Sequence, residues 1–252
     1  EYGGRISSVM DITTRDGNKK RLSGKVGAST FGAKITLEGP LKKAKNPDDM
    51  TASFIISAKN SYLDKTSQSV YKPILNGNEL PYTYNDIYGK ISLNSTNGSK
   101  INFFGFNFTD DVMNYKSISN FGWDSYGGGV NFVVIPGKSP TMIEGNVAYS
   151  DYTARLEEAN NPNRMSSING FNAGFAFTYF LGKNTLKYGI EMLGFKTVFD
   201  YFKSNGIHIS QVDNTTELGA YVKYKAQFDK LILEPSFRLQ AYASLSELSP
   251  EP

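Results

Sequence analysis

Apolar and polar residues alternate along about eleven segments of this chain, and a period of two residues is typical of β-strands. The clearest segment is 217–228, whose even positions are apolar: Leu218, Ala220, Val222, Tyr224, Ala226 and Phe228. Successive side chains of a strand point to opposite faces, so each segment has one apolar face and one polar face. The pattern predicts an all-β protein.

The alternation recurs over the segments 33–38, 87–94, 172–181, 186–192 and 231–243, and it includes Phe104, Phe106 and Phe108. Many segments run for about ten residues, whereas globular strands average about five or six. A tilted strand needs about nine to eleven residues to cross a bilayer. The lengths therefore favour the wall of a membrane barrel with its apolar positions facing lipid. A water-soluble β-sandwich, which also alternates, is the alternative.

The links between the segments are short and long by turns. The short links are 45–49, 97–100, 136–140, 182–184 and 229–230, and the long links are 60–83, 110–120, 153–165 and 201–215. Consecutive hairpins place all short links at one end of the sheet and all long links at the other, as in outer-membrane barrels. We therefore predict an antiparallel transmembrane β-barrel, an up-and-down meander of about eleven strands that is part of a larger barrel.

The composition agrees with such a wall. Apolar residues make up 39% of the chain and aromatic residues 13%, which suits a sheet with one apolar and one polar face. The 27 Lys and Arg nearly balance the 24 Asp and Glu, and the basic residues are spread along the chain without forming a cluster. Nucleic acid is therefore not an expected partner. Aromatic residues near the segment ends predict girdles at the membrane surfaces: Tyr62, Tyr82, Tyr84, Trp123, Tyr126, Tyr149, Tyr152, Phe199, Tyr201 and Phe202.

Few residues of the catalytic types are present. The chain has no Cys and one His, which is His208 in the link 201–215. A catalytic triad needs a His beside a nucleophile and a carboxylate, and no nucleophile-elbow pattern occurs. A zinc site of three or four His and Cys ligands is excluded by their number. We expect no enzyme activity, no metal site and no cofactor.

The first residues carry a more specific motif: Gly4, Arg5, Ile6, Ser7, Ser8, Val9, Met10, Asp11 and Ile12. This segment resembles the closing strand of the plug in TonB-dependent outer-membrane receptors. The segments 37–41 (Leu-Glu-Gly-Pro-Leu) and 84–90 (Tyr-Asn-Asp-Ile-Tyr-Gly-Lys) are similar to early barrel strands of that family.

The resemblance implies that residues 1–18 are the last plug strand and its linker. Residues 19–252 are then the N-terminal part of a barrel that in this family has 22 strands. It implies the bacterial outer membrane and TonB-energised uptake of a scarce nutrient: a siderophore, cobalamin, a glycan or a peptide. The expected partners are outer-membrane lipid, the rest of the barrel and plug, the TonB complex and a surface lipoprotein. A porin-like or adhesive barrel without energy coupling is the alternative.

Two sets of residues are candidates for the functional sites. Polar positions of the alternating segments are expected to face the lumen and the plug: Lys187, Glu191, Glu217, Lys223, Lys225, Glu234 and Arg238. Residues in or near the long links are expected to contact ligand from outside, because loops carry most binding residues: Tyr71, Trp123, Tyr152, Arg155 and Arg164.

Overall fold

The computed structural model describes residues 10, 12–72, 80–115, 118–137, 139–158, 161–203, 206–243 and 247–251. Most of the predicted plug strand, residues 1–9 and 11, lies outside the described residues. Residues 12–18, which belong to the predicted linker, form no regular secondary structure.

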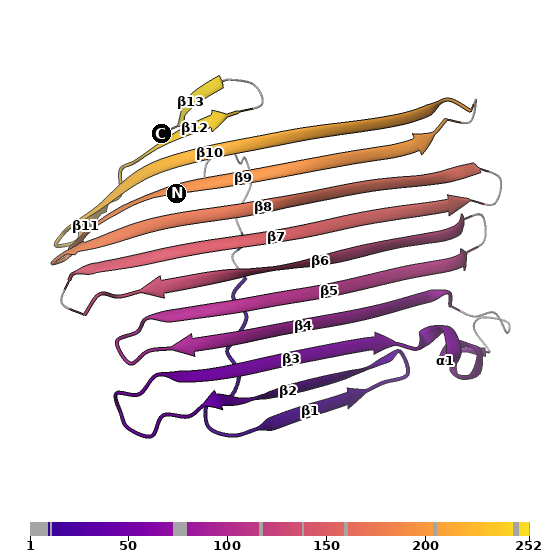
Figure 1. Cartoon of the computed structure of the whole chain (residues 1–252), viewed down its shortest axis with the longest axis horizontal. Helices are drawn as coiled ribbons and strands as arrows, with labels where there is room; N and C mark the ends of the chain where they lie inside the picture. Colours follow the sequence, from indigo (N-terminus) through magenta and orange to yellow (C-terminus); the bar gives the residue numbers. More distant parts are fainter. Residues whose placement is uncertain are drawn as a thin grey trace.

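The described residues form one antiparallel sheet of thirteen strands (Figure 1). The strands are β1 (Ser23–Ala28), β2 (Gly32–Lys42), β3 (Thr51–Ser61), β4 (Tyr82–Asn94), β5 (Lys100–Tyr115), β6 (Ile118–Val134), β7 (Thr141–Glu158), β8 (Asn161–Leu181), β9 (Asn184–Phe202), β10 (His208–Phe228), β11 (Leu231–Leu233), β12 (Ser236–Tyr242) and β13 (Glu247–Glu251). They pair in chain order, except that β10 pairs with both β11 and β12. The predicted all-β meander is confirmed, and it is an open sheet with β1 and β13 at opposite edges.

The predicted short links lie together at one end of the sheet, on the left of Figure 1. Of the four predicted long links, only 60–83 is a long connection between strands, and it contains the helix α1 (Leu63–Val70). The predictions of long loops at 110–120, 153–165 and 201–215 are wrong, because strands β5–β10 continue through most of these residues. Backbone pairing continues there without apolar alternation, since polar side chains on both faces of a strand are tolerated in water.

Residues directly opposite each other in an antiparallel pair lie on the same face, so the register divides the side chains into two faces. The apolar face holds the connected row Phe54, Ile91, Phe103, Val130, Val147, Ala173, Met192, Leu218 and Ala241. The polar face holds the adjacent row Glu38, Ile55, Lys90, Phe104, Gly129, Ala148, Asn172, Leu193, Glu217 and Tyr242.

Glycines opposite aromatic residues help to fix this register. Gly127 of β6 lies opposite Phe106 of β5, and a Cβ at Gly127 would come within 2.8 Å of the phenyl ring. Gly189 of β9 lies opposite Tyr221 of β10, where a Cβ would come within 2.9 Å of the phenol ring. A slip of one residue would bring a side chain under each ring and would exchange the two faces.

Burial on the two faces is the reverse of that in a water-soluble protein. The apolar face is exposed, with Val147 at 59%, Ile190 at 63% and Phe237 at 51% exposure. Buried polar side chains of the sheet all lie on the polar face, and they are Thr36, Glu38, Ser53, Ser61, Lys90, Ser92, Asn102, Thr178 and Gln240. The polar side chains therefore pack against one another, and the apolar ones have no protein layer over them in the described structure.

The exposed apolar face forms a band of limited height. On β8 it extends from Phe171 to Leu181, about 33 Å along the strand at about 3.3 Å per residue. Beyond Phe171, the same face carries Asn169, opposite Asp151 of β7. Aromatic residues lie near both ends of the band, with Tyr149 of β7 near one end and Tyr179 of β8 near the other. Several predicted girdle residues lie instead on the polar face: Tyr82, Tyr84, Trp123, Tyr152, Phe199 and Tyr201.

One apolar set faces opposite to our expectation. Phe104 of β5 is opposite Lys90 of β4, so Phe104, Phe106 and Phe108 lie on the polar face. The apolar face of β5 is formed by Ile101 and Phe103, with Gly105 next along the strand. Alternation alone could not assign the side here, because both faces of this strand carry phenylalanine.

Candidate functional site

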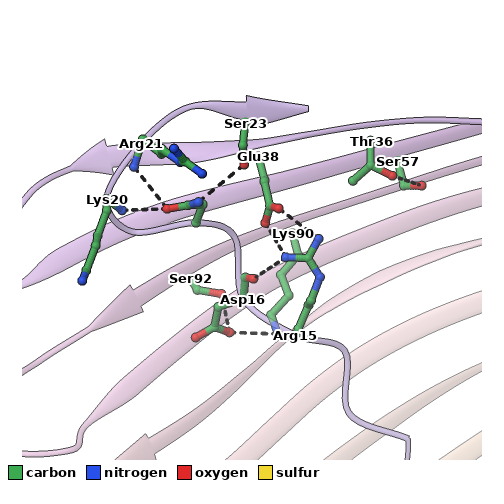
Figure 2. Close-up of polar contacts among 11 residues, drawn as sticks. Arg15, Asp16, Lys20, Arg21, Ser23, Thr36, Glu38, Ser57, Lys90 and Ser92 are labelled. Atoms are coloured by element: carbon green, nitrogen blue, oxygen red, sulfur yellow. Dashed lines mark hydrogen bonds and ion pairs between the residues drawn. The ribbon is translucent and has the colours of Figure 1, made fainter. Parts of the chain in front are cut away.

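Residues 12–18, which we call the N-terminal segment, run across the polar face roughly perpendicular to the strands (Figure 1). Figure 2 shows that Arg15 and Asp16 point toward side chains of β2 and β4. The longest-range of these contacts join residues 76 or more positions apart in the chain. This segment and the strands beneath it form a connected polar cluster.

Arg15 forms a two-pronged ion pair with Glu38 of β2. Its Nη2 donates to Oε1 of Glu38 at 3.1 Å, and its Nη1 donates to Oε2. The Glu38 side chain is only 10% exposed, whereas that of Arg15 is 55% exposed. Paired guanidinium and carboxylate groups fix orientation as well as distance, so the pair holds the segment in one position over β2.

Asp16 accepts three hydrogen bonds or ion contacts from the polar face. Oδ1 of Asp16 lies 2.8 Å from Nζ of Lys100, 3.3 Å from Nζ of Lys90 and 3.1 Å from Oγ of Ser92. Burial by itself raises the pKa of the Asp16 carboxyl, but the bonds and charge of Lys100, with the bonds of Lys90 and Ser92, outweigh burial, so the pKa lies below its ordinary value. Asp16 is therefore an anchoring carboxylate.

Lys90 joins the segment to the sheet a second time. Its Nζ donates to the backbone carbonyl of Thr14 at 2.7 Å, and its side chain is only 3% exposed. The hydroxyl of Thr14 is also 2.6 Å from the phenol oxygen of Tyr88. A buried ammonium needs several partners, and Lys90 has two of them in the N-terminal segment: the carbonyl of Thr14 and the carboxylate of Asp16.

Gly17 and Asn18 explain how the chain turns from this crossing into β1. A Cβ at Gly17 would overlap the carbonyl oxygen of Phe54, so only glycine allows the backbone to lie flat on β3. The side-chain oxygen of Asn18 accepts hydrogen bonds from the backbone N–H of Lys20 at 2.9 Å and of Arg21 at 3.1 Å. Asn side chains commonly stabilise such turns.

A second polar cluster lies on β9–β12. Arg238 of β12 donates to Glu191 of β9 at 3.0 Å, and Gln240 donates to Glu217 of β10 at 3.2 Å. Glu234 lies 2.9 Å from Nζ of Lys223 and 3.3 Å from Nζ of Lys225. Lys187 pairs with Glu144 of β7 at 3.4 Å.

All seven predicted lumen-facing residues thus take part in this network of charges. Of these, the six that lie on strands share the polar face: Lys187, Glu191, Glu217, Lys223, Lys225 and Arg238.

The five predicted ligand residues do not form one site, although Arg155 and Arg164 line the same hollow and Trp123 and Tyr152 are diagonal neighbours on β6 and β7. Tyr71 follows α1, with its ring stacked on Phe31. Trp123 and Tyr152 lie on the polar face, and Arg164 shares that face and pairs with Glu158 at 3.3 Å. Arg155 lies on the opposite face, where it pairs with Asp124 at 2.5 Å. The three polar-face residues are on strands β6–β8 and not in the predicted loops.

Sequence reasoning missed the roles of Arg15, Asp16 and Gly17, which it assigned only to a linker. Their partners lie in β2–β5, and no local pattern indicates which strands they meet. The one available signal was the polar run Arg-Asp-Gly-Asn directly before the first strand.

His208 lies at the start of β10, with Nε2 2.6 Å from Oδ1 of Asp200. Within the described ranges, no cluster of three or more His, Asp or Glu side chains has the geometry to hold a metal ion. The one helix of the described residues is too short to span a bilayer.

No protein-family model matches the chain, and no curated protein sequence matches it.

Proposed function

We propose that this chain is part of a TonB-dependent outer-membrane receptor, which takes up a scarce nutrient with energy supplied through TonB. Strands β2–β10 and β12 form part of its transmembrane wall. The N-terminal segment is the junction where the plug joins that wall. The bacterial outer membrane is the compartment, and lipid, the rest of the barrel and the TonB complex are the partners.

The inverted burial of the sheet carries this proposal. A sheet that exposes Ile, Val, Leu and Phe on one face and buries polar side chains on the other is costly in water and favourable where lipid covers the apolar side. At a strand tilt of about 40°, the band of about 33 Å along β8 corresponds to a height of about 25 Å, the height of the apolar band of barrel walls. Strands of 16 to 21 residues in β5–β10 exceed the bilayer-spanning length, so they extend beyond the membrane.

The contacts of the N-terminal segment favour a receptor with a plug over a plain pore. Arg15 and Asp16 attach the segment to the lumen side of the wall through charged pairs. An empty pore has no need for a chain lying across its inner face. A plug that fills the lumen requires such a junction, because the segment leads directly into the first strand.

The test uses the complete gene product expressed in a Gram-negative bacterium. We expect the protein in the outer-membrane fraction, and we expect an immobilised periplasmic domain of the host's TonB to retain it from detergent extract. An outer-membrane protein that TonB does not retain would favour the porin-like or adhesive alternative. A folded protein in the soluble fraction would contradict both functions.

A further inference from the structure

The apolar face carries a hollow over strands β7–β12, which we call the apolar hollow. Its volume is about 590 Å³. The small side chains Ala173 of β8, Ala220 of β10 and Ala241 of β12 lie in it. Larger side chains of the same face, among them Phe175, Ile190 and Leu239, stand around them. The surface therefore sinks where three strands carry alanine.

The apolar hollow lies within the band that we assign to lipid. Its β8 residues Ala173 and Phe175 belong to the stretch from Phe171 to Leu181. Phe175 is 38% exposed and Leu239 is 41% exposed, so the hollow is open to the surroundings. A hydrocarbon chain that fills it makes contacts with its walls and leaves no hydrogen bond unmet.

A cation lies beyond one end of the hollow on the same face. Lys196 of β9 follows Met192, which lines the hollow, by four residues or about 13 Å along the strand. Asn169 of β8 and Asn214 of β10 lie directly opposite Lys196 on its two sides. An ammonium between two amide groups supplies several N–H donors, as a phosphate group requires.

Lys196 is available to such a group. It is exposed, and within the described residues no carboxylate forms an ion pair with it. Arg155, which lies on the same face beyond the band, is already paired with Asp124. The carboxylate of Asp151 lies on β7, on the far side of Asn169, and accepts a hydrogen bond from Thr153.

We propose that this surface binds one anionic phospholipid, with an acyl chain in the apolar hollow and the phosphate group at Lys196, Asn169 and Asn214. The inference rests on the membrane location in the proposed function, and it goes beyond nutrient uptake. Bulk lipid covers an apolar face without regard to its headgroup. A hollow and a cation on the same strands select one lipid by both its chain and its charge.

The test measures retained lipid by native mass spectrometry of the complete gene product in detergent. The protein is exchanged into equal amounts of dioleoylphosphatidylglycerol and dioleoylphosphatidylcholine, which share their acyl chains and differ in net charge. We expect phosphatidylglycerol to be retained roughly fivefold over phosphatidylcholine.

Four variants separate the two parts of the site. Lys196→Gln should abolish the preference, whereas Arg155→Gln, which removes a paired cation of the same face, should keep it. Ala220→Phe fills the hollow and should lower the retention of both lipids. Ala58→Phe adds the same ring to the apolar face of β3, away from the hollow, and should leave retention unchanged.

Three outcomes would overturn the inference: neither lipid is preferred, Lys196→Gln keeps the preference, or Ala220→Phe retains as much lipid as the unaltered protein. A dimer that Ala220→Phe dissociates would also overturn it, because a second copy would then occupy the hollow. Fractionation and TonB retention are measured separately. An outer-membrane protein that TonB retains but that shows no lipid preference contradicts only the lipid site. A lipid preference in a protein that TonB does not retain contradicts only the receptor function.

Discussion

The ammonium of Lys90 lies 3.3 Å from the carboxylate of Asp16. The hydroxyl of Ser92, which is 76 residues further along the chain than Asp16, donates to the same carboxylate. The pair joins a segment with no secondary structure to the middle of the sheet. Since the Lys90 side chain is 3% exposed, loss of either partner would leave a charge poorly solvated.

Lys90→Ala should release the N-terminal segment from the sheet. It removes the bonds of Lys90 to Asp16 and to the Thr14 carbonyl, which together are worth about 1–3 kcal/mol. A spin label at Ile12→Cys, an exposed site, would show a larger mobile component. Lys59→Ala, which removes an exposed pair with Asp86, is the control and should cost under about 0.5 kcal/mol. Equal mobility in both variants would contradict the anchoring role.

Gly17→Ala should displace the segment by steric overlap. The added methyl group would meet the carbonyl oxygen of Phe54, which belongs to the paired backbone of β3 and cannot move aside. Gly27→Ala is a matched control, since a Cβ there has no atom within 4 Å. The same spin label should become mobile in the first variant and stay as it is in the second. A mobile label in neither variant would show that the backbone does not lie against β3.

Acid should loosen the segment through Asp16. The folded state lowers the pKa of this carboxyl from its ordinary value of 3.8. Its stabilising contribution is therefore fully present above that value and is lost as the pH falls through the lower pKa of the folded state. The spin label should be immobile from pH 7 to about pH 4.5 and gain mobility below about pH 3.8. Asp16→Asn should lack this part of the acid response; identical curves for the two proteins would assign it elsewhere.

A charge on the apolar face should destabilise the protein in lipid. Val222→Arg and Leu239→Arg should each lower the free energy of unfolding by roughly 2–4 kcal/mol, because both side chains belong to the exposed band. Lys223→Arg, one position along β10 on the polar face, should have little effect. Urea titration of protein folded in vesicles measures the difference. Equal tolerance at positions 222 and 223 would refute the assignment of the faces.

The sequence predicts the meander and the position of its short turns. The alternation of 217–228 needs only local reading, since each side chain of a strand points opposite to its neighbours. The turn at 182–183 is equally local, with Gly182 at a φ of +63°.

What the sequence could not provide depends on pairing between distant segments. The end of β7 and the start of β8 carry polar residues on both faces, so the sequence alone predicts a loop there, although the two strands pair as far as Glu158 and Asn161. The contacts of Arg15 and Asp16 depend on which strands lie beneath them. Which side chains of β5–β9 share a face is known only when the five strands are set in register, because each strand alone is an ordinary mixture of aromatic and neutral polar side chains.

The central claim is that lipid covers the apolar face. The chain has no cysteine, so a single one can carry a fluorescent dye. Val147→Cys and Asn146→Cys place the dye on opposite faces of β7 at adjacent positions. In vesicles, a quencher attached to the lipid acyl chains should strongly quench the dye at position 147 and hardly affect the dye at position 146. Equal quenching at both positions, or none at 147, would contradict the account.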